Sequence, residues 1–493
     1  MLNAAQSNYD IVILGAGFGG LGMAAQLKMQ GIDNFIVLER GNRIGGVWRD
    51  NAYPGAACDT ESHLYCYSFF PHLRVSKMYA DRNELLRYMD ALAAHYEVLP
   101  HVRLDSELTE ARWDEDAQRW GFTLADGSHL QGRFFVPAWG QLNKPAIPAF
   151  KGLDSFAGQY FHSAQWPADA QLADKKVASI GAAASAVQYV PEVAKEAAQL
   201  TVFQRSANWI MPRNQIVFSQ EQLDAYSARP ELFHESRRDL HAFRENGFAR
   251  TRHGTDAQQE GIKMASGHLA AQVPDADLRA KLTPDYEFAC KRILRSDDYY
   301  PALMRSNVSL ETTAVDHFVP EGIVDKNGTL HEFDVVIFGT GFESQAFQGD
   351  LQVIGRNGQT LHQRWQDGAE AYLGMTVPGF PNLFMIYGPN TNLNHNSIIT
   401  MLEIQQRYII QAVQRLETPA LDVTEEAFSA YNDALQTNMQ SSAFSSDCSS
   451  WYKNAAGKVI NNWSGTVDEY RALATDWRAS DYHLLGIHNE VVS

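Results

Sequence analysis

Three glycines and one glutamate near the start of the chain have the types and spacing that bind a dinucleotide. The segment GAGFGG places Gly15, Gly17 and Gly20 where they would allow a tight turn, a close approach of backbone to a pyrophosphate, and close packing of a helix on a strand. Glu39 follows at the end of the next apolar run, where a carboxylate accepts hydrogen bonds from ribose hydroxyls. A carboxylate there disfavours a 2′-phosphate, so the sequence predicts FAD or NAD at this site rather than NADP.

A second and weaker signal of the same kind begins at Gly181, where GAAASA keeps only the first glycine. Ala183 replaces the glycine that lets backbone approach phosphate, and its methyl group could weaken or shift that contact. The next apolar run ends in Arg205 and Ser206 instead of an acid, and a guanidinium beside a hydroxyl suits a 2′-phosphate. This pattern predicts NADPH, although Arg205 could also be an ordinary surface arginine at a strand end.

Strands and helices must alternate around both loops to hold them in place. The apolar run YDIVIL at 9–14 precedes the first loop, and a helical stretch to Gln30 follows it. The same order returns over 175–205, and a further apolar strand spans 333–342. Strand–turn–helix units of this kind build open parallel sheets. We therefore predict an α/β fold with two Rossmann-like dinucleotide-binding domains and a helical insertion.

The helical insertion is predicted over 214–284, where the spacing is helical and no convincing strand occurs. We expect it to be attached to the second dinucleotide-binding domain. The predicted first domain consists of 1–140 and 345–493, which includes the C-terminal loops, and the second consists of 141–213 and 285–344. Within 345–493, the pattern of residues 381–391 predicts a strand and a turn, and that of residues 397–416 predicts a long helix.

The composition is that of an ordinary globular protein, since 45% of the 493 residues are hydrophobic and 20% are charged. The formal net charge of −17 argues against binding to nucleic acid or to an anionic membrane surface, because both need clustered Lys and Arg. No apolar run approaches the ~20 residues that cross a membrane. The N-terminus lacks the basic and apolar regions of a secretory signal, so we expect a cytoplasmic protein.

Four cysteines, Cys58, Cys66, Cys290 and Cys448, are too few and too scattered to predict a disulfide framework. No CxxC pair occurs, so we predict no metal site. Cys58 and Cys66 also lack the close spacing that a pyridine-nucleotide disulfide reductase needs beside its flavin. We therefore expect reduced cysteines.

The segment FAGQYFHSAQWP at 156–167 has the form F-x-G-x-x-x-H-x-x-x-W-P, and by this pattern the chain resembles the type I Baeyer–Villiger monooxygenases. Members of that family use FAD, NADPH and O2 to insert an oxygen atom next to a ketone carbonyl. Relatives that hydroxylate nitrogen or sulfur usually end the segment in Tyr or Phe instead of Trp166-Pro167. We expect His162 and Trp166 to serve as hinge and packing residues between the two domains and not as catalysts.

The resemblance implies which residues surround the cofactors. It places Val47, Trp48, Asp59 and Tyr65 along the flavin, which favours FAD over NAD at the first site, although Trp48 and Tyr65 could simply pack in the core. For NADPH it implies Ser185 and Gln188 at the start of the helix after the second loop, Lys291 at the 2′-phosphate and Trp451 in a loop that folds over the cofactor. The segment 388–397 resembles a flavin-side loop in which Asn394 stands where relatives often have glycine.

The resemblance also implies the catalytic pair. Arg292 would reach the flavin face and stabilise a flavin C4a-peroxide and then the oxyanion of the ketone adduct, while Asp59 would hold Arg292 and modulate its charge. Without the resemblance, Asp59 could be a turn aspartate and Arg292 a solvated residue. The predicted partners are a small-molecule ketone and O2, and the products an ester or a lactone. The alternatives are an N- or S-oxygenating flavin monooxygenase and a flavin-binding regulatory protein without turnover.

Overall fold

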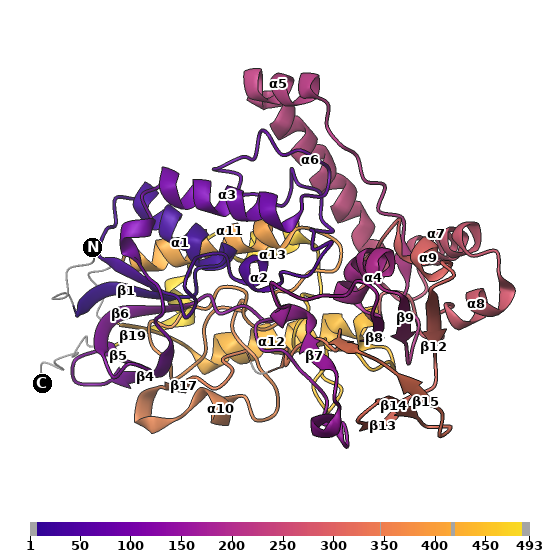
Figure 1. Ribbon diagram of the computed structural model, residues 1–493. Coiled ribbons are helices and arrows are strands. Elements are labelled where there is room, and N and C mark those ends of the chain that lie inside the picture. Colours follow the sequence, from indigo (N-terminus) through magenta and orange to yellow (C-terminus); the bar gives the residue numbers. More distant parts are fainter. Residues whose placement is uncertain (1–6, 346, 416–419, 486–493) are drawn as a thin grey trace, which may run out of the picture.

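Two sheets lie side by side in the computed structural model, which describes residues 7–345, 347–415 and 420–485 (Figure 1). The first sheet has seven strands in the order β17-β4-β5-β6-β1-β2-β3, and the second has five in the order β12-β9-β8-β16-β7. The predicted α/β class is confirmed. Both sheets have a strand leading into a glycine turn and a helix, as the two loop signals predicted.

The first sheet is mixed, with a parallel core and an antiparallel meander. Strand β1 runs parallel to β2 and β6, and β6 continues antiparallel through β5 to β4. Its strands are β1 (Asn8–Leu14), β2 (Phe35–Leu38), β3 (Val102–Arg103), β4 (Leu108–Asp114), β5 (Arg119–Leu124), β6 (His129–Pro137) and β17 (Gln352–Ile354). Strand β2, between β1 and β3, is buried along its whole length, as a parallel strand covered on both faces must be.

Helices cover this sheet, and a large apolar core lies between them and the strands. Figure 1 shows α1, α3 and α11 along one side of the sheet. The helices of this part are α1 (Phe18–Met29), α2 (Val47–Asp50), α3 (Arg82–His95), α10 (Leu361–Arg364), α11 (Ile398–Val413), α12 (Glu425–Met439) and α13 (Val467–Leu473). Helix α11 begins as predicted, because the Ser397 side chain accepts a hydrogen bond from the Ile399 N–H. Its predicted end at Leu416 lies outside the described residues.

The second sheet is parallel throughout. Its strands and the helices α4 and α9 beside it are β7 (Gln159–His162), β8 (Lys176–Ile180), α4 (Ala184–Glu196), β9 (Gln199–Phe203), α9 (Tyr299–Leu303), β12 (Val308–Glu311) and β16 (Val335–Phe338). Three small sheets complete the described strands: β10 (Ile210–Met211) with β11 (Leu294–Arg295), β13 (Val315–Val319) with β14 (Gly322–Asp325) and β15 (Leu330–Glu332), and β18 (Ala420–Val423) with β19 (Tyr482–Leu485).

The region 214–284 is helical and contains no strand, as predicted. Its helices are α5 (Gln220–Ala228), α6 (Pro230–Asn246), α7 (Asp256–Gln272) and α8 (Ala276–Lys281). In Figure 1, α5 and α6 project from the body of the molecule, whereas α7 and α8 lie beside the second sheet. Among the described residues, no helix is both long and apolar enough to span a bilayer.

The strand predicted within 381–391 is wrong. Leu383 makes an isolated bridge to Phe135 of β6, and the segment exchanges three backbone hydrogen bonds with Phe135 and Pro137 of that strand. It nevertheless does not form a regular strand. The reason lies in its backbone, because Asn382 and Tyr387 have positive φ angles of 54° and 62° and so break the extended conformation at both ends.

The expectation of four reduced cysteines is also wrong. Cys58 and Cys66 are free and buried, but Cys290 and Cys448 form a disulfide with their Cα atoms 6.5 Å apart. These two residues are 158 positions apart in the sequence. Their pairing depends on how two distant loops meet, which spacing alone does not reveal.

Candidate functional site

The loop between β1 and α1 has the shape of a phosphate cradle. Gly15 has a φ of 100°, which favours glycine, and a Cβ on Gly20 would lie 1.8 Å from the Gly15 carbonyl oxygen. Helix α1 then begins at Phe18 with Gly17 at its N-cap, where no side chain caps the helix within the described structure. Its first backbone N–H groups are therefore free to bind an anion, and the helix dipole favours negative charge there.

Glu39 braces this loop from the end of β2. Its buried carboxylate accepts hydrogen bonds from the Ala16 N–H at 2.8 Å, the Gly41 N–H at 2.7 Å and the Arg49 guanidinium at 2.7 Å. The three donors fix the carboxylate at the carboxyl end of the parallel strands, where ligands of such sheets bind. The predicted contact with a ribose remains a prediction.

Trp48 and Tyr65 lie together beside the first loop. The Trp48 indole N–H donates to the Tyr65 hydroxyl at 3.3 Å, and the Tyr65 ring packs edge-on against Phe18 with centroids 5.3 Å apart. Burial raises the pKa of Tyr65 well above its ordinary value. Val47, at the start of α2, remains 37% exposed. The three side chains are thus placed where they can border a ligand of the first loop, and Trp48 and Tyr65 also serve as packing.

The second loop repeats the backbone of the first in spite of its alanine. Ala183 is the N-cap of α4 with φ −87° and ψ −160°, and Gly17 is the N-cap of α1 with φ −85° and ψ −167°. These angles are ordinary extended backbone that any residue adopts. Gly181 keeps the positive φ of 105° that the turn requires. Ala183 therefore leaves the shape of the loop unchanged.

Two residues predicted at this loop, Ser185 and Gln188, lie in the first turns of α4. The Gln188 side-chain amide accepts a hydrogen bond from the Tyr53 hydroxyl at 2.9 Å and donates to the Ala57 carbonyl at 2.8 Å. Gln188 thus links α4 of the second sheet to the segment just before Asp59. That link was not predicted from the sequence.

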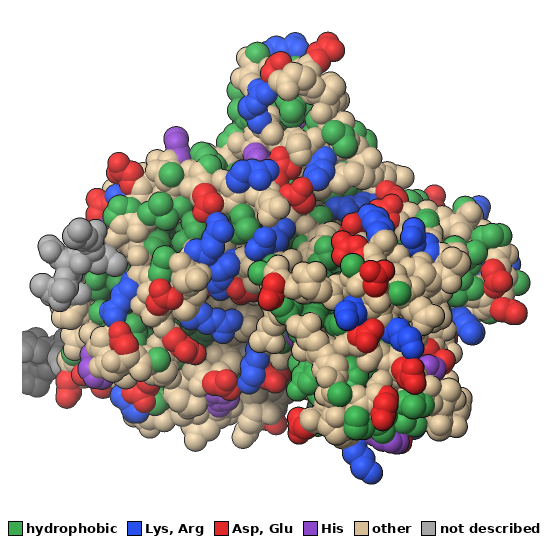
Figure 2. All heavy atoms as spheres, in the orientation of Figure 1, with side chains coloured by type: hydrophobic (Ala, Val, Ile, Leu, Met, Phe, Trp, Pro, Cys, Tyr) green, Lys and Arg blue, Asp and Glu red, His purple; other side chains and the backbone are tan. Residues whose placement is uncertain are grey.

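Lys291, Ser206 and Arg205 come together as predicted. The Lys291 ammonium lies 3.2 Å from the Ser206 hydroxyl and 4.2 Å from the centre of the Tyr286 ring. Burial lowers the pKa of Lys291, and the charge of Arg205 lowers it further, while Asp285 acts in the opposite direction. The like charges of Lys291 and Arg205 act on each other, and an anion bound between them would be stabilised. Figure 2 shows Lys and Arg side chains along the middle of the molecule, where its two parts meet, although the net charge is −17.

Asp59 and Arg292 form the predicted pair. Asp59 lies in the loop between α2 and α3, and Arg292 lies just before β11; one guanidinium nitrogen contacts both carboxylate oxygens at 2.7 Å. The Asp59 and Arg292 side chains are 24% and 35% exposed, so both remain partly accessible to solvent or to a ligand. Burial alone would raise the pKa of Asp59, but the charge and hydrogen bonds of Arg292 outweigh it, so this pKa is lowered. Both groups are charged at neutral pH.

Two arginines of α6 reach the same segment and were missed by sequence reasoning. Arg244 pairs with Glu61 at 2.7 Å and also approaches the Asp59 carbonyl at 3.5 Å. Arg237 donates to the His63 carbonyl at 2.7 Å and pairs with Glu403 of α11 at 3.4 Å. All four charged side chains are largely buried. From the sequence this region was predicted only as helical, and the partners of its arginines are too distant in the chain to be found by spacing.

The fingerprint segment 156–167 contains β7 and the short helical turn Ser163–Gln165. His162 is fully buried at the end of β7, where its Nδ1 accepts a hydrogen bond from the Ala164 N–H at 3.1 Å. Burial lowers its pKa, so its ring is neutral at pH 7. Trp166 packs against Phe161 and Tyr189 with centroids 5.0 and 5.6 Å apart. Trp166 has the packing role that we predicted for it, and the hinge role of His162 remains a prediction.

Trp451 lies in the C-terminal loop. Its ring packs on Tyr452 with centroids 4.8 Å apart, and its carbonyl accepts a hydrogen bond from the Asn461 side chain at 2.6 Å. Asn394, in the segment predicted beside the flavin, does not have a positive φ, so the absence of glycine at this position does not strain the backbone.

Comparison with known proteins agrees with this geometry. Residues 8–219 match the family model for flavin-binding monooxygenase-like proteins. A Baeyer–Villiger monooxygenase of Pseudomonas aeruginosa is 37% identical over 98% of this chain and 92% of that protein. A Baeyer–Villiger monooxygenase of Streptomyces coelicolor is also 37% identical, over 96% of this chain and 92% of that protein.

Solved structures show the same likeness. An oxidised steroid monooxygenase bound to NADP is 30% identical with a TM-score of 0.84, covering 95% of this chain and 97% of that one. Cyclohexanone monooxygenase from Rhodococcus sp. Phi1, bound to NADP+, is 26% identical with a TM-score of 0.87, covering 97% and 99%. The chain therefore belongs to the Baeyer–Villiger monooxygenase family of flavin-binding monooxygenases, as its segment 156–167 predicted.

Proposed function

We propose that this protein is an FAD-containing, NADPH-dependent monooxygenase that inserts one oxygen atom of O2 next to the carbonyl of a ketone and forms an ester or a lactone. The observation that carries the proposal is the Asp59–Arg292 pair. Arg292 directly follows Lys291, which contacts Ser206 just after β9, and it pairs with a residue of the predicted flavin segment. One short segment thus connects both cofactor sites.

The first loop fits FAD. Its glycines permit the tight turn, because a Cβ on Gly15 or Gly20 would clash with neighbouring backbone, and the uncapped start of α1 offers N–H groups to a pyrophosphate. Glu39 would bind the ribose, and Val47, Trp48 and Tyr65 would border the flavin. We assign 1–140 and 345–493 to the domain that holds this cofactor.

The second loop fits NADPH. Gly181 and the first turn of α4, with Ser185, would bind the pyrophosphate, while Arg205, Ser206 and Lys291 would bind the 2′-phosphate. Gln188 would hold α4 against the flavin segment, and Trp451 would cover the bound nucleotide. We assign 141–213 and 285–344 to this domain, with 214–284 as its helical insertion.

FAD and NADPH, when bound, would supply the oxygen-activating chemistry and the electrons. The chain itself supplies charge stabilisation. Arg292 uses one nitrogen for Asp59, so its remaining N–H groups can bind the negative charge that develops on oxygen at the ketone carbonyl. Asp59 orients the guanidinium and keeps it from moving into bulk water. The pair therefore acts as a positioned cation and not as a proton donor.

The test is a product analysis of the purified flavin-loaded protein. With NADPH, air and a panel of ketones, we expect oxygen uptake and an ester or lactone that is one oxygen atom heavier than the ketone. Products oxygenated only at nitrogen or sulfur would instead support the alternative monooxygenase class, against which Arg292 and Trp166-Pro167 count. A flavin-loaded protein that oxidises no NADPH with any ketone would indicate a regulatory protein without turnover.

A further inference from the structure

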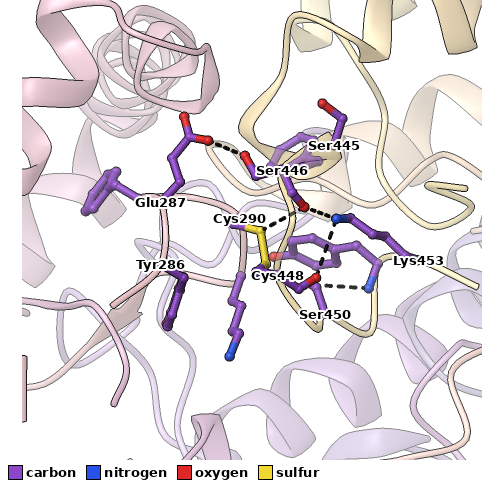
Figure 3. Close-up of a disulfide and its surroundings, with 12 residues drawn as sticks. Tyr286, Glu287, Cys290, Ser445, Ser446, Cys448, Ser450 and Lys453 are labelled. Atoms are coloured by element: carbon purple, nitrogen blue, oxygen red, sulfur yellow. Dashed lines mark hydrogen bonds between the residues drawn. A yellow bond between two sulfur atoms is a disulfide. The ribbon is translucent and has the colours of Figure 1, made fainter. Parts of the chain in front are cut away.

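The Cys290–Cys448 disulfide joins the two segments most closely connected with the proposed NADPH site. Cys290 directly precedes Lys291 and Arg292, and Cys448 lies three residues before Trp451 in the C-terminal loop. Figure 3 shows the two sulfur atoms meeting from separate loops, with Glu287, Ser446 and Lys453 around them. We use the term control loop for residues 443–453. The disulfide fastens this loop to the segment that bears Lys291 and Arg292.

Weaker contacts surround the disulfide and would remain if it opened. Glu287 accepts a hydrogen bond from the Ser446 hydroxyl, and Lys453 donates to the Ser446 carbonyl. The insertion also takes part, because the His253 ring lies 2.8 Å from the Glu287 carboxylate and 3.3 Å from the Ser445 hydroxyl. These polar contacts can hold the control loop in place loosely, whereas the covalent bond prevents it from leaving.

The two cysteines differ in access. Cys290 is fully buried, whereas Cys448 is only partly buried and lies between the exposed residues Asp447 and Ser449. A small oxidant or a thiol from solution therefore reaches the sulfur of Cys448 first. The Lys453 ammonium lies 3.4 Å from the Cys448 carbonyl, and the exposed Asp447 directly precedes this cysteine, so charges of both signs flank it and its accessibility is what distinguishes it.

The other two cysteines lack these properties. Cys58 and Cys66 are buried, and burial raises the pKa of the Cys58 thiol to about 12. A thiol of this kind is inert at neutral pH. Among the four cysteines, reactivity is thus concentrated in the one pair that touches the control loop.

We propose that Cys290 and Cys448 form a peroxide-sensitive thiol switch that, when oxidised, holds the control loop shut over the nucleotide site and slows exchange of NADPH and NADP+. The proposal depends on the proposed function for its nucleotide. Its oxidant is hydrogen peroxide, the two-electron reduction product of O2, which is the co-substrate of the proposed oxygenation.

The chemistry balances with peroxide alone. The Cys448 thiol takes one oxygen atom from hydrogen peroxide, giving a sulfenic acid and one water. The Cys290 sulfur then attacks the Cys448 sulfur, the S–S bond forms, and the hydroxyl leaves with the Cys290 proton as a second water. Two electrons pass from sulfur to the O–O bond of the peroxide. A dithiol reverses the step by attacking Cys448 through a mixed disulfide and regenerating both thiols.

The experiment compares the flavin-loaded full-length protein after hydrogen peroxide and after dithiothreitol. We expect two free thiols per denatured chain in the first state and four in the second. Release of NADP+, followed by stopped-flow fluorescence without ketone, should be about fivefold or more faster in the reduced state, within the range of coupling between two events in one protein. Trypsin should also cleave more quickly after Lys453 in the reduced state.

Two variants complete the test. Cys448→Ser should release NADP+ at the reduced rate and respond to neither treatment, whereas Ser450→Ala, which keeps the pair, should respond like the wild type. If the thiol count changes but the release rate and cleavage do not, or if peroxide fails to close the pair, the proposal is wrong. If Cys448→Ser does not fold, the comparison of NADP+ release by the oxidised and the reduced wild-type protein is sufficient to test the proposal. The thiol count and the proteolysis do not depend on turnover. They therefore test the thiol switch even if the protein does not carry out the proposed oxygenation.

Discussion

The Nη2 nitrogen of Arg292 contacts both carboxylate oxygens of Asp59 at 2.7 Å, although 233 residues separate the two in the sequence. Nε and Nη1 take no part in this contact. A bidentate pair would have used two guanidinium nitrogens for the carboxylate. The arrangement observed anchors the guanidinium at one corner and leaves its other donors for a ligand.

Removing the guanidinium should abolish oxygenation while flavin reduction persists. In Arg292→Ala we expect product formation to fall by about 10²–10³-fold, the usual loss when one donor to a developing oxyanion is removed. Anaerobic stopped-flow absorbance measures flavin reduction by NADPH separately from product. Lys263→Ala, which removes an exposed charge on α7, is the control and should retain both activities. Full oxygenation by Arg292→Ala would refute the role of this residue.

The Asp59–Arg292 pair should stabilise the fold at neutral pH and cease to do so in acid. Because the pKa of Asp59 is lowered in the folded protein, its stabilising contribution is present above the unfolded carboxyl pKa of about 3.9 and is lost as the pH falls through the folded value. We expect the urea midpoint of Asp59→Asn to lie below that of the wild type at pH 7, and the gap to narrow below about pH 4. A gap independent of pH would contradict an ionised pair.

Arg205 and Lys291 should select NADPH over NADH. Each can make a charged hydrogen bond to the 2′-phosphate, worth about 1.5–3 kcal/mol, so Arg205→Ala or Lys291→Ala should raise the KM for NADPH roughly 10–100-fold. NADH, which lacks the phosphate, is the internal control, and its KM should change little. An unaltered ratio of the two KM values in both variants would place the selection elsewhere.

Ala183→Gly tests whether the alanine in the second loop is harmful. Since Ala183 has the same extended backbone as Gly17, we expect the Kd for NADP+ to remain within about twofold of the wild type. Fluorescence titration measures it. A large gain in affinity would mean that the methyl group itself obstructs the phosphate.

Breaking the buried Arg244–Glu61 pair should be costly. In the described part of the chain, Arg244→Met leaves the buried Glu61 carboxylate with the Tyr79 hydroxyl at 3.2 Å as its hydrogen-bond donor and with the charge of Arg295 nearby, and we expect a loss of about 3–5 kcal/mol in the free energy of unfolding. Adding Glu61→Gln removes the uncompensated charge and should recover much of that loss. Denaturant unfolding of both variants checks this, and equal stability of the single variant and the wild type would contradict it.

The sequence revealed the parts of the site that depend on local backbone. Gly15, Gly20 and Gly181 are readable because a tight turn restricts which residue can occupy it, and Glu39 is readable because it follows at a fixed distance along one strand–helix–strand unit. The pairing of Asp59 with Arg292 was reached only through a family resemblance, since nothing local in either segment indicates the other.

Contacts between distant segments account for what was missed. Arg237 and Arg244 lie on a helix whose charges resemble those of a solvated surface, and only the fold shows that they are buried against Glu403 and Glu61. The disulfide was missed for the same reason. The strand expected near Leu383 failed because positive φ angles at Asn382 and Tyr387 are set by tertiary hydrogen bonding and not by propensity.

Helices α6 and α7 follow each other in the chain but pack against different parts of the molecule. The arginines of α6 bind it to the flavin segment and α11, whereas α7 contacts β10 and α9 of the other part. If the two parts rotate during turnover, the short helical turn Gly247–Thr251 between them must bend like a joint. Replacing 214–284 with the insertion of a relative would therefore change the stiffness of this connection as well as any selectivity for substrate. A change in the turnover rate of such a chimera could not be attributed to substrate fit alone.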